Sequence, residues 1–202
     1  MTGVILLARF ESPAARWRLW RTARIAIEQA APHELVKLVG KVSVAEHLLR
    51  APLTGRACTC WSLTIDDLGT EDAGRLVDIN QGASFRLTDR DATIFVTPLF
   101  CRIIADASAV VTREFPRDAQ VSLHLDRYLD EAADRGECQG ALAMLRRGSP
   151  LRVREAIVHD GSTVAVLGLV ETRTNSLHEE GKHITCPDNG PLLVSDVPSL
   201  QR

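Results

Sequence analysis

Apolar and polar side chains alternate along much of this chain and predict a mostly β protein. The alternation is clearest in residues 36–44 (VKLVGKVSV) and returns in residues 57–65. Neighbouring side chains on a strand point to opposite faces, so this pattern is typical of half-buried strands. Shorter apolar runs with the same character occupy residues 84–87, 93–97, 100–104, 151–158, 163–171 and 191–196. We expect about eight to ten short strands, closed into a small barrel or sandwich.

Turn residues and glycines divide this pattern. Asp160-Gly161 lies between two apolar runs and predicts a tight hairpin. The segments VKLVGKV and VAVLGLV share one arrangement of apolar residues around Gly40 and Gly168. These glycines are therefore expected to mark bends in two barrel strands. The polar stretch 66–80 is expected to be a solvated loop, and the polar stretch 172–189 is expected to be mobile.

Two segments with helical spacing complete the expected β-rich α+β fold. The helical spacing of Leu125, Leu129 and Ala132 predicts an inserted helical segment near residues 125–147, with Gly136 dividing it in two. An N-terminal helix is expected to begin at Pro13 and to end before Pro32, and helical spacing puts Trp20, Ala23, Ile27 and Ala30 on its apolar face. The apolar run 3–10 suggests an edge strand before it. We therefore predict an N-terminal part, 1–34, and a β domain, 35–202.

Charge and composition narrow the classes of function. Five arginines and two glutamates give residues 1–32 a net charge of +3 (5 − 2), so the rest of the 202-residue chain carries −5 (−2 − 3). An acidic body with 4% aromatic residues argues against nucleic-acid binding. No apolar run approaches the roughly 18 residues that a membrane-spanning helix needs. Five cysteines, an odd number, fit reduced thiols, so we expect a cytoplasmic protein, either free or peripheral to a membrane.

Metal and catalytic motifs are weak. The nearest metal signal is Cys58-x-Cys60, with His183-x-x-Cys186 as a second half. Zinc knuckles usually separate their ligands by about two to four residues, so we instead expect Cys58 and Cys60 to share one strand face in the core. The sequence contains no G-x-S-x-G nucleophile elbow and no phosphate-binding loop. We predict no catalytic residue, no bound metal and no cofactor.

Glu155 follows Arg154 at the start of a predicted strand, so the two side chains should point to opposite faces. We expect Glu155 to have a structural role, as an ion pair or as a hydrogen-bond partner of a turn.

A cluster of tryptophans and arginines in the N-terminal helix is the main candidate binding site. Tryptophan with arginine is typical both of helices at a membrane surface and of protein-interface hot spots. A third interpretation is a helix packed on the barrel, with tryptophans inward and arginines in solvent. The candidate residues are Arg16, Trp17, Arg18, Trp20, Arg21 and Arg24.

Four segments between residues 35 and 199 resemble the BAM/GIDE domain, the β-rich module that membrane-anchored RING-type E3 ubiquitin ligases carry beside the membrane. They appear in the family's order. The segments are Gly40-Lys41-Val42 with APLTGRAC at 51–58, FRLTD at 85–89 with Val96-Thr97-Pro98, Arg154-Glu155 with Gly161, Val164, Val166 and Gly168, and LVSD at 193–196.

The resemblance implies a recognition module near a membrane. Eukaryotic relatives add two membrane helices and a RING, whereas this sequence has no C-x2-C pair and no membrane-spanning segment. Ligase activity is therefore not carried over. We expect a non-catalytic binding or scaffold module with a protein partner, and a membrane surface as the second choice of partner. The alternative is an enzyme, either a hydrolase with an unrecognised site or a component of a ubiquitin-ligase-like system. The sequence does not indicate an oligomeric state.

Overall fold

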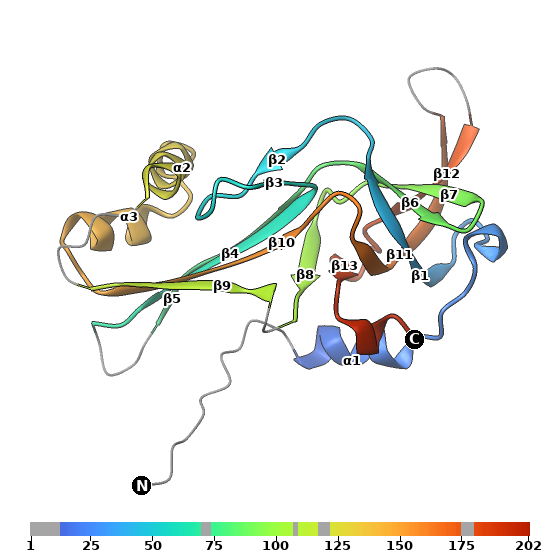
Figure 1. Cartoon of the computed structure of the whole chain (residues 1–202), viewed down its shortest axis with the longest axis horizontal. Helices are drawn as coiled ribbons and strands as arrows, with labels where there is room; N and C mark the ends of the chain where they lie inside the picture. The colour runs from blue at the N-terminus through green and yellow to red at the C-terminus, as the bar shows by residue number, and fades with distance from the viewer. Residues whose placement is uncertain (1–12, 70–73, 107–108, 117–121, 175–179) are drawn as a thin grey trace, which may run out of the picture.

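The computed structural model describes residues 13–69, 74–106, 109–116, 122–174 and 180–202, and it confirms a β-rich α+β fold with a barrel, an N-terminal helix and inserted helices (Figure 1). Within this part of the chain there are thirteen strands and three α-helices. The strands are β1 (Leu35–Val44), β2 (Leu49–Arg50), β3 (Ala57–Cys58), β4 (Cys60–Asp67), β5 (Arg75–Gly82), β6 (Phe85–Asp89), β7 (Ala92–Val96), β8 (Cys101–Ile104), β9 (Val111–Phe115), β10 (Leu151–Val158), β11 (Thr163–Thr174), β12 (Glu180–Thr185) and β13 (Leu192–Ser195). The helices are α1 (Pro13–Arg21), α2 (Leu123–Asp134) and α3 (Gln139–Arg146), with 3₁₀ turns η1 (Ile27–Gln29) and η3 (Pro198–Leu200).

Five strands close into a mixed barrel in the order β1-β6-β7-β12-β11, because β11 pairs again with β1. The β7–β12 pair is parallel, and the other four pairs are antiparallel. Alternate residues of these strands point inward and form one buried cluster, which includes Leu38, Phe85, Ile94, Val166 and Ile184. Closure of the barrel leaves these five strands with few unpaired edges. The same sheet continues beyond the barrel, because β11 also pairs with β13, and β13 pairs with β8.

Gly40 and Gly168 lie where a barrel strand changes its neighbour. β11 pairs with β13 up to Leu167 and with β12 from Leu169 onwards. A Cβ atom at Gly168 would contact Leu192 and lie 2.7 Å from the Thr185 carbonyl oxygen, and one at Gly40 would lie 2.6 Å from the Thr88 carbonyl oxygen. Both positions need glycine because another backbone comes too close for a side chain.

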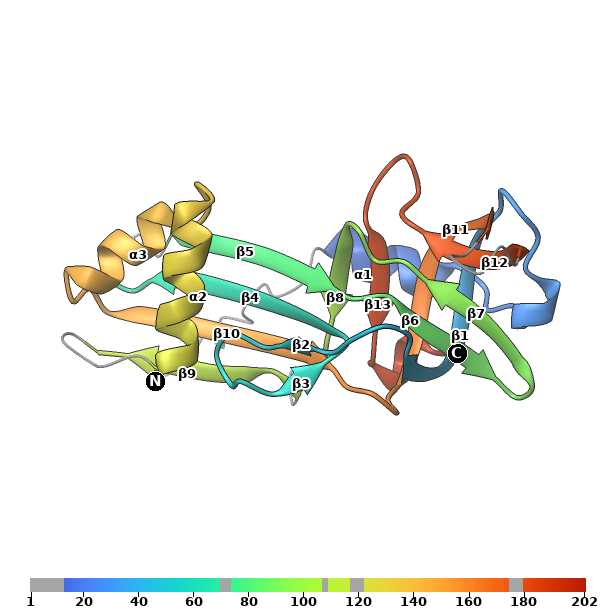
Figure 2. The same cartoon turned by 90° about the horizontal axis from the view of Figure 1, so that it is seen from above.

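A second, four-stranded antiparallel sheet in the order β5-β4-β10-β9 extends from the barrel and carries α2 and α3 on one face (Figures 1 and 2). Leu125, Leu129 and Ala132 are buried on α2 as their spacing predicts. Tyr128 meets Trp61 of β4 edge to face, with ring centroids 5.3 Å apart. Gly136, with φ of 82°, ends the first helix, so the predicted division of residues 125–147 is confirmed.

Several predicted boundaries are wrong. The N-terminal helix ends at Arg21, and only a 3₁₀ turn follows before Pro32. Residues 66–80 are not a loop throughout, because β4 continues to Asp67 and β5 begins at Arg75. Likewise, β11 and β12 occupy part of 172–189. Polar residues are tolerated in this part of β11 and β12 because their side chains lie in solvent, as those of Thr172, Arg173 and Lys182 do. The strand expected at residues 3–10 lies outside the described residues.

Candidate functional site: the outer face of α1

Helix α1 is attached to the barrel by a narrow apolar stripe. Ala15 and Leu19 are its buried residues, and they pack with Val39, Leu193 and Leu200 from β1, β13 and η3. The sequence analysis assigned the apolar face to Trp20, Ala23, Ile27 and Ala30. That assignment is wrong because the helix stops at Arg21. Ile27 and Ala30 are buried, but from the segment that follows α1.

A buried lysine fixes the end of this helix. Lys37 of β1 is 1% exposed, and its Nζ donates hydrogen bonds to the carbonyl oxygen of Leu19 (3.1 Å) and to the main-chain oxygen of Arg202 (2.7 Å). Burial lowers the pKa of Lys37, and the charge of Arg24 lowers it further. A donor at the last turn satisfies a carbonyl that the helix leaves unpaired. The helix is therefore held in place without its tryptophans.

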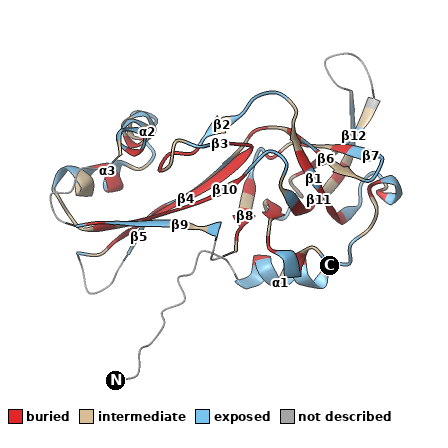
Figure 3. Ribbon diagram, viewed as in Figure 1, coloured by how far each residue is buried: buried red, intermediate tan, exposed pale blue. Residues whose placement is uncertain are grey.

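Much of α1 is exposed to solvent (pale blue in Figure 3), and both of its tryptophans are among the exposed residues. Trp17 is 51% and Trp20 is 67% exposed, and the Arg21 guanidinium lies 4.9 Å from the centre of the Trp17 ring. With Arg16, these residues form what we call the Trp–Arg face: Arg16, Trp17, Trp20 and Arg21. The interpretation with tryptophans packed inward is wrong, because Leu19 already occupies the position against the barrel.

A shallow hollow of about 380 Å³ adjoins this face. Pro13, Arg16 and the two tryptophans line one side of it, and Ser199 and Leu200 line the other. Large aromatic rings beside an open apolar hollow are typical of surfaces that receive a side chain of a partner.

Two of the six candidate residues lie away from the Trp–Arg face. Arg18 is half-buried and points toward the loop at Gly190. Arg24 follows the helix and pairs with Asp89 at 2.8 Å. Helical spacing explains this outcome for Arg18, which lies roughly 100° around the helix from Trp17. The pairing of Arg24 depends on the barrel and has no signal in the sequence.

The weak metal candidates do not converge. Cys58 and Cys60 do not share a face: Cys58 belongs to the core under α2, whereas Cys60 belongs to the barrel core. The break between β3 and β4 at Thr59 separates them. His183 stacks on Phe95 of the barrel, with ring centroids 5.2 Å apart. The Cys186 thiol accepts a hydrogen bond from the Phe100 N–H and donates one to the Phe100 carbonyl oxygen. Among the residues that the structure describes, no three His, Cys, Asp or Glu side chains are grouped to hold a metal ion.

Glu155 is the hydrogen-bond partner of a turn, as expected. Its Oε1 accepts from the Leu53 N–H at 2.6 Å, and its Oε2 accepts from the Thr54 N–H at 3.2 Å and the Thr54 hydroxyl at 2.6 Å. Arg154 points to the other face of the sheet and pairs with Asp66. These contacts make Glu155 a structural residue.

A second hollow, of about 420 Å³, lies between β5, β8 and the α2–α3 connection. Its lining includes Asn80, Phe100, Cys101, Arg102 and Cys138. The sequence contains no signal for this hollow because its lining residues come from four distant segments, 76–80, 100–102, 137–138 and 191, none of which carries a motif.

Comparison of the chain with known protein families, with curated proteins and with solved structures found no match. Among the described residues, no helix has the length and apolar character needed to cross a bilayer.

Proposed function

We propose that this protein is a non-catalytic binding module that docks on a protein partner through the Trp–Arg face. The observation that carries the proposal is the exposure of Trp17 and Trp20, 51% and 67%, on a helix that is anchored by other residues. Exposing an indole ring to water costs free energy that burial in an interface recovers, at about 25 cal/mol per Å². Tryptophan is also among the residues that contribute most to binding at interfaces.

The charge of the face defines the chemistry of the partner. Helix α1 contains three arginines and no acidic residue. An acidic segment would pair with Arg16 and Arg21, and an apolar side chain beside it would enter the hollow at Trp17, Trp20 and Leu200. We therefore propose a partner segment that combines carboxylates with one large apolar residue.

A protein fits this face better than a lipid bilayer does. The helix has only nine residues, and its large exposed apolar side chains are the two tryptophans. Stable insertion into a bilayer usually requires a longer apolar face. A hollow beside the rings, in contrast, suits a single side chain of a folded or extended peptide.

We also propose kinship with the BAM/GIDE domain, which would place the module in a larger assembly near a membrane. What supports this is the position of the four resembling segments, which lie in or next to β1 and β3, β6 and β7, β10 and β11, and β13. Two of them touch, since Glu155 of the third segment holds the turn at Leu53 and Thr54 of the first. An experimental BAM/GIDE structure lacking this strand order would remove that support.

Panning a peptide library against the full chain tests the docking proposal. We expect enrichment of peptides in which Asp or Glu flanks a large apolar residue. Binding is then measured by the fluorescence of Trp17 and Trp20, because Trp61, the third tryptophan, is buried. Trp20→Ala should weaken binding of a selected peptide at least about tenfold, the loss of about 1.4 kcal/mol or more expected for a hot spot. Arg16→Glu/Arg21→Glu should abolish it.

Matched variants separate docking from general effects on the surface. Leu123→Ala removes an exposed apolar residue of α2, and Arg127→Glu reverses an exposed charge on the same helix. Both should bind the peptide as the wild type does. Equal loss in these controls, or enrichment of peptides without acidic residues, would contradict the proposal. Co-sedimentation with phosphatidylserine vesicles, lost in Arg16→Glu/Arg21→Glu, would assign the face to a membrane surface instead.

A further inference from the structure

The outer side of helix α2 combines a large apolar residue with a row of carboxylates. Leu123, in the first turn of α2, is 69% exposed. Asp126, Asp130 and Asp134 follow it at steps of three and four residues, so the four side chains form one stripe along the helix. The buried residues of α2 lie on its other side. We call this surface the Leu–Asp stripe: Leu123, Asp126, Asp130 and Asp134.

The carboxylates of this stripe are poorly compensated within the chain. Like charges four residues apart, such as Asp126 and Asp130, destabilise a helix. Asp134 lies at the C-terminal end of α2, where the helix dipole favours a cation. Arg146 pairs with Asp130 at 2.6 Å, but in the described part of the chain no cation pairs with Asp126 or Asp134. These carboxylates are therefore available to a cationic surface of another molecule.

Helix α1 has the complementary charge. It carries three arginines and no acidic residue, a charge of +3, whereas four carboxylates and one arginine give α2 a charge of −3 (1 − 4). The whole chain has a net charge of only −2, so two copies do not repel each other strongly. Among the described residues, no other large exposed apolar side chain lies on a helix or strand of net negative charge.

The spacing of the two surfaces also agrees. The hollow beside the tryptophans, of about 380 Å³, is large enough for the Leu123 side chain of a second copy. Asp126 and Asp130 are about 6 Å apart along the α2 axis, and Arg16 and Arg21 are about 7.5 Å apart along the α1 axis, at about 1.5 Å per residue. Two carboxylates can thus face two guanidiniums beside the docked leucine.

The two surfaces of one copy cannot meet each other. In Figure 1, α1 lies below the barrel and α2 lies above the four-stranded sheet, and Figure 2 also shows the two helices well separated along the molecule. A two-fold dimer could use both contacts only if both surfaces faced the same side of the molecule. The contact between copies is therefore head to tail.

We propose that the partner of the Trp–Arg face is a second copy of this chain, which docks through its Leu–Asp stripe. This inference rests on the docking function proposed above. Two short helices bury less than the roughly 1,200 Å² of a stable interface, so each contact is weak, with a dissociation constant on the order of tens of micromolar. Successive copies add to an open chain that lengthens with protein concentration and shortens as salt screens the charges.

Sedimentation velocity of the full chain tests self-association directly. The protein is measured from about tenfold below to about tenfold above the expected dissociation constant. We expect the weight-average sedimentation coefficient to rise with protein concentration, and this rise to become smaller as sodium chloride is added. A sedimentation coefficient that stays at the monomer value throughout would overturn the proposal.

A mixture of two variants tests the head-to-tail arrangement. Trp20→Ala damages the Trp–Arg face, and Leu123→Ala/Asp126→Arg damages the Leu–Asp stripe. Each variant alone should remain monomeric where the wild type associates. An equimolar mixture should form a heterodimer that grows no further, because each variant keeps one intact surface. Association of either variant alone to the extent of the wild type, or a mixture that stays monomeric, would contradict the arrangement.

Exchanging the charges tests the pairing itself. Arg16→Glu/Arg21→Glu should abolish self-association, because the carboxylates of α2 then face carboxylates. Adding Asp126→Arg/Asp130→Arg to the same chain should restore it, since every pair is again of opposite charge. Circular dichroism of each variant verifies that it is folded. A chain with all four changes that remains monomeric would count against these pairs.

A matched control separates pairing from net charge. Glu46→Arg/Asp91→Arg makes the same change of charge at two exposed carboxylates outside α2. Added to Arg16→Glu/Arg21→Glu, it should leave the chain monomeric. Restored association in this control would show that net charge governs the association, and the proposed contact would be wrong.

Peptide binding distinguishes failure of this inference from failure of the docking function. If the wild type stays monomeric while selected acidic peptides bind at Trp17 and Trp20, self-association is wrong and docking on another protein stands. If neither the peptides nor a second copy bind, both proposals are wrong. If the wild type associates, a selected peptide should compete for the Trp–Arg face and return the chain to monomers. Association that the bound peptide does not displace would place the contact elsewhere on the molecule and overturn the proposal.

Discussion

At the scale of single residues, a few buried polar side chains bind distant parts of the chain together. Glu155 is 1% exposed and connects β10 to the turn at Leu53 and Thr54, roughly a hundred positions earlier. The same turn accepts the Ser122 hydroxyl at its Leu53 carbonyl oxygen (3.2 Å), and Ser122 caps α2. The loop between β2 and β3 is thus fixed by two side chains that reach it from elsewhere.

Replacing Glu155 by glutamine tests this connection. The glutamine side chain keeps one oxygen that can accept a hydrogen bond. In place of the second oxygen it has an NH₂ group, which cannot accept the hydrogen bonds that the Thr54 N–H and hydroxyl donate to Glu155. We expect Glu155→Gln to lower the free energy of unfolding by about 2 kcal/mol, as measured by chemical denaturation. Glu131→Gln, an exposed change of equal charge on α2, should cost within about 0.5 kcal/mol. Equal losses in the two variants would show that Glu155 does not hold the turn.

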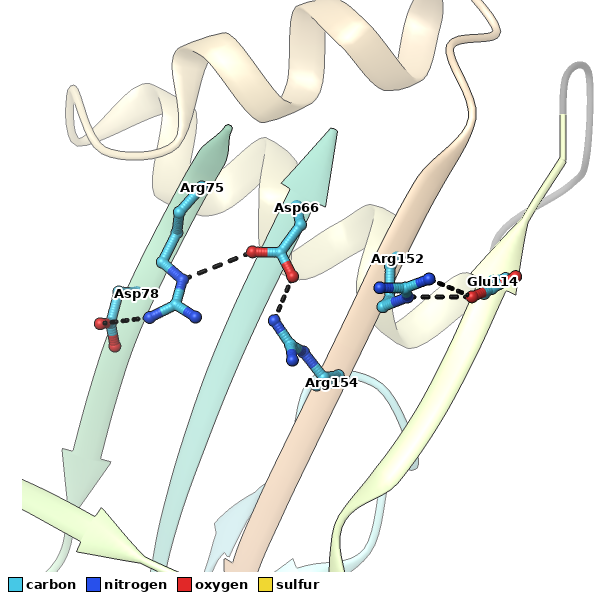
Figure 4. A network of polar contacts seen from close by, with 6 residues as sticks. All are labelled: Asp66, Arg75, Asp78, Glu114, Arg152 and Arg154. Carbon is cyan, nitrogen blue, oxygen red and sulfur yellow. Dashed lines mark hydrogen bonds and ion pairs between the residues drawn. The ribbon is translucent and has the colours of Figure 1, made fainter. Parts of the chain in front are cut away.

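Ion pairs on the face of the sheet opposite the helices differ in burial and should therefore differ in strength (Figure 4). Asp66 pairs with the buried Arg154 and accepts a longer contact from Arg75 at 3.4 Å. Arg152 pairs with Glu114 at 2.7 Å near the sheet edge, where the two side chains are 38% and 58% exposed.

Removing one partner of each pair should give unequal losses. Asp66→Asn should destabilise the protein by about 3 kcal/mol, because the buried Arg154 guanidinium loses the Asp66 carboxylate charge with which it pairs. Glu114→Gln should cost less than about 1 kcal/mol, since water and salt screen an exposed pair. Thermal or chemical unfolding of both variants measures the difference. A cost for Glu114→Gln as large as for Asp66→Asn would contradict this ranking.

At the scale of elements, close backbone contacts in the barrel determine where β11 can change partners. Gly168 lies between the β13 and β12 pairings, and a Cβ there would meet Leu192 and the Thr185 carbonyl. In helix α3, by contrast, a Cβ at Gly140 would meet nothing within 4 Å.

Substituting alanine at these two glycines should change stability in opposite directions. Gly168→Ala should lower the free energy of unfolding by about 2–3 kcal/mol, because the added methyl group forces strands apart. Gly140→Ala should raise it by about 0.5 kcal/mol, because alanine has the better helix propensity. Denaturant midpoints with unchanged slopes would measure both effects. A tolerated Gly168→Ala would show that the barrel strands are not closely packed there.

At the scale of the whole molecule, two strands run through both cores. In β4, Cys60 belongs to the barrel core, whereas Trp61 and Leu63 belong to the core under α2 and α3. In β10, Val153 lies in the helix-covered core and Val158 in the barrel core. Neither core is complete without these strands.

We therefore expect the barrel and the four-stranded sheet to unfold together. Calorimetry should show one transition with equal calorimetric and van't Hoff enthalpies. Fluorescence of Trp61, which is buried in the helix-covered core, should change in the same transition as the far-ultraviolet circular dichroism. Two separate transitions would show that the cores are independent domains.

The sequence by itself determined the elements whose signals are local. Alternation in residues 36–44, the Asp160-Gly161 turn and the spacing of Leu125, Leu129 and Ala132 all depend on near neighbours, and the structure has the corresponding strands, turn and helix. Gly40 of β1 and Gly168 of β11 were also identified as special positions from the sequence, because the pattern of apolar residues around each glycine is local.

Only the tertiary structure decided which polar segments became strands and which face of α1 is free. β5 is rich in polar residues but pairs along β4, and backbone pairing does not require an apolar side chain. The exposure of Trp17 and Trp20 follows from the space that Leu19 and Lys37 occupy against the barrel. Such placements depend on packing between residues far apart in the chain, which a pattern read over a few neighbours does not contain.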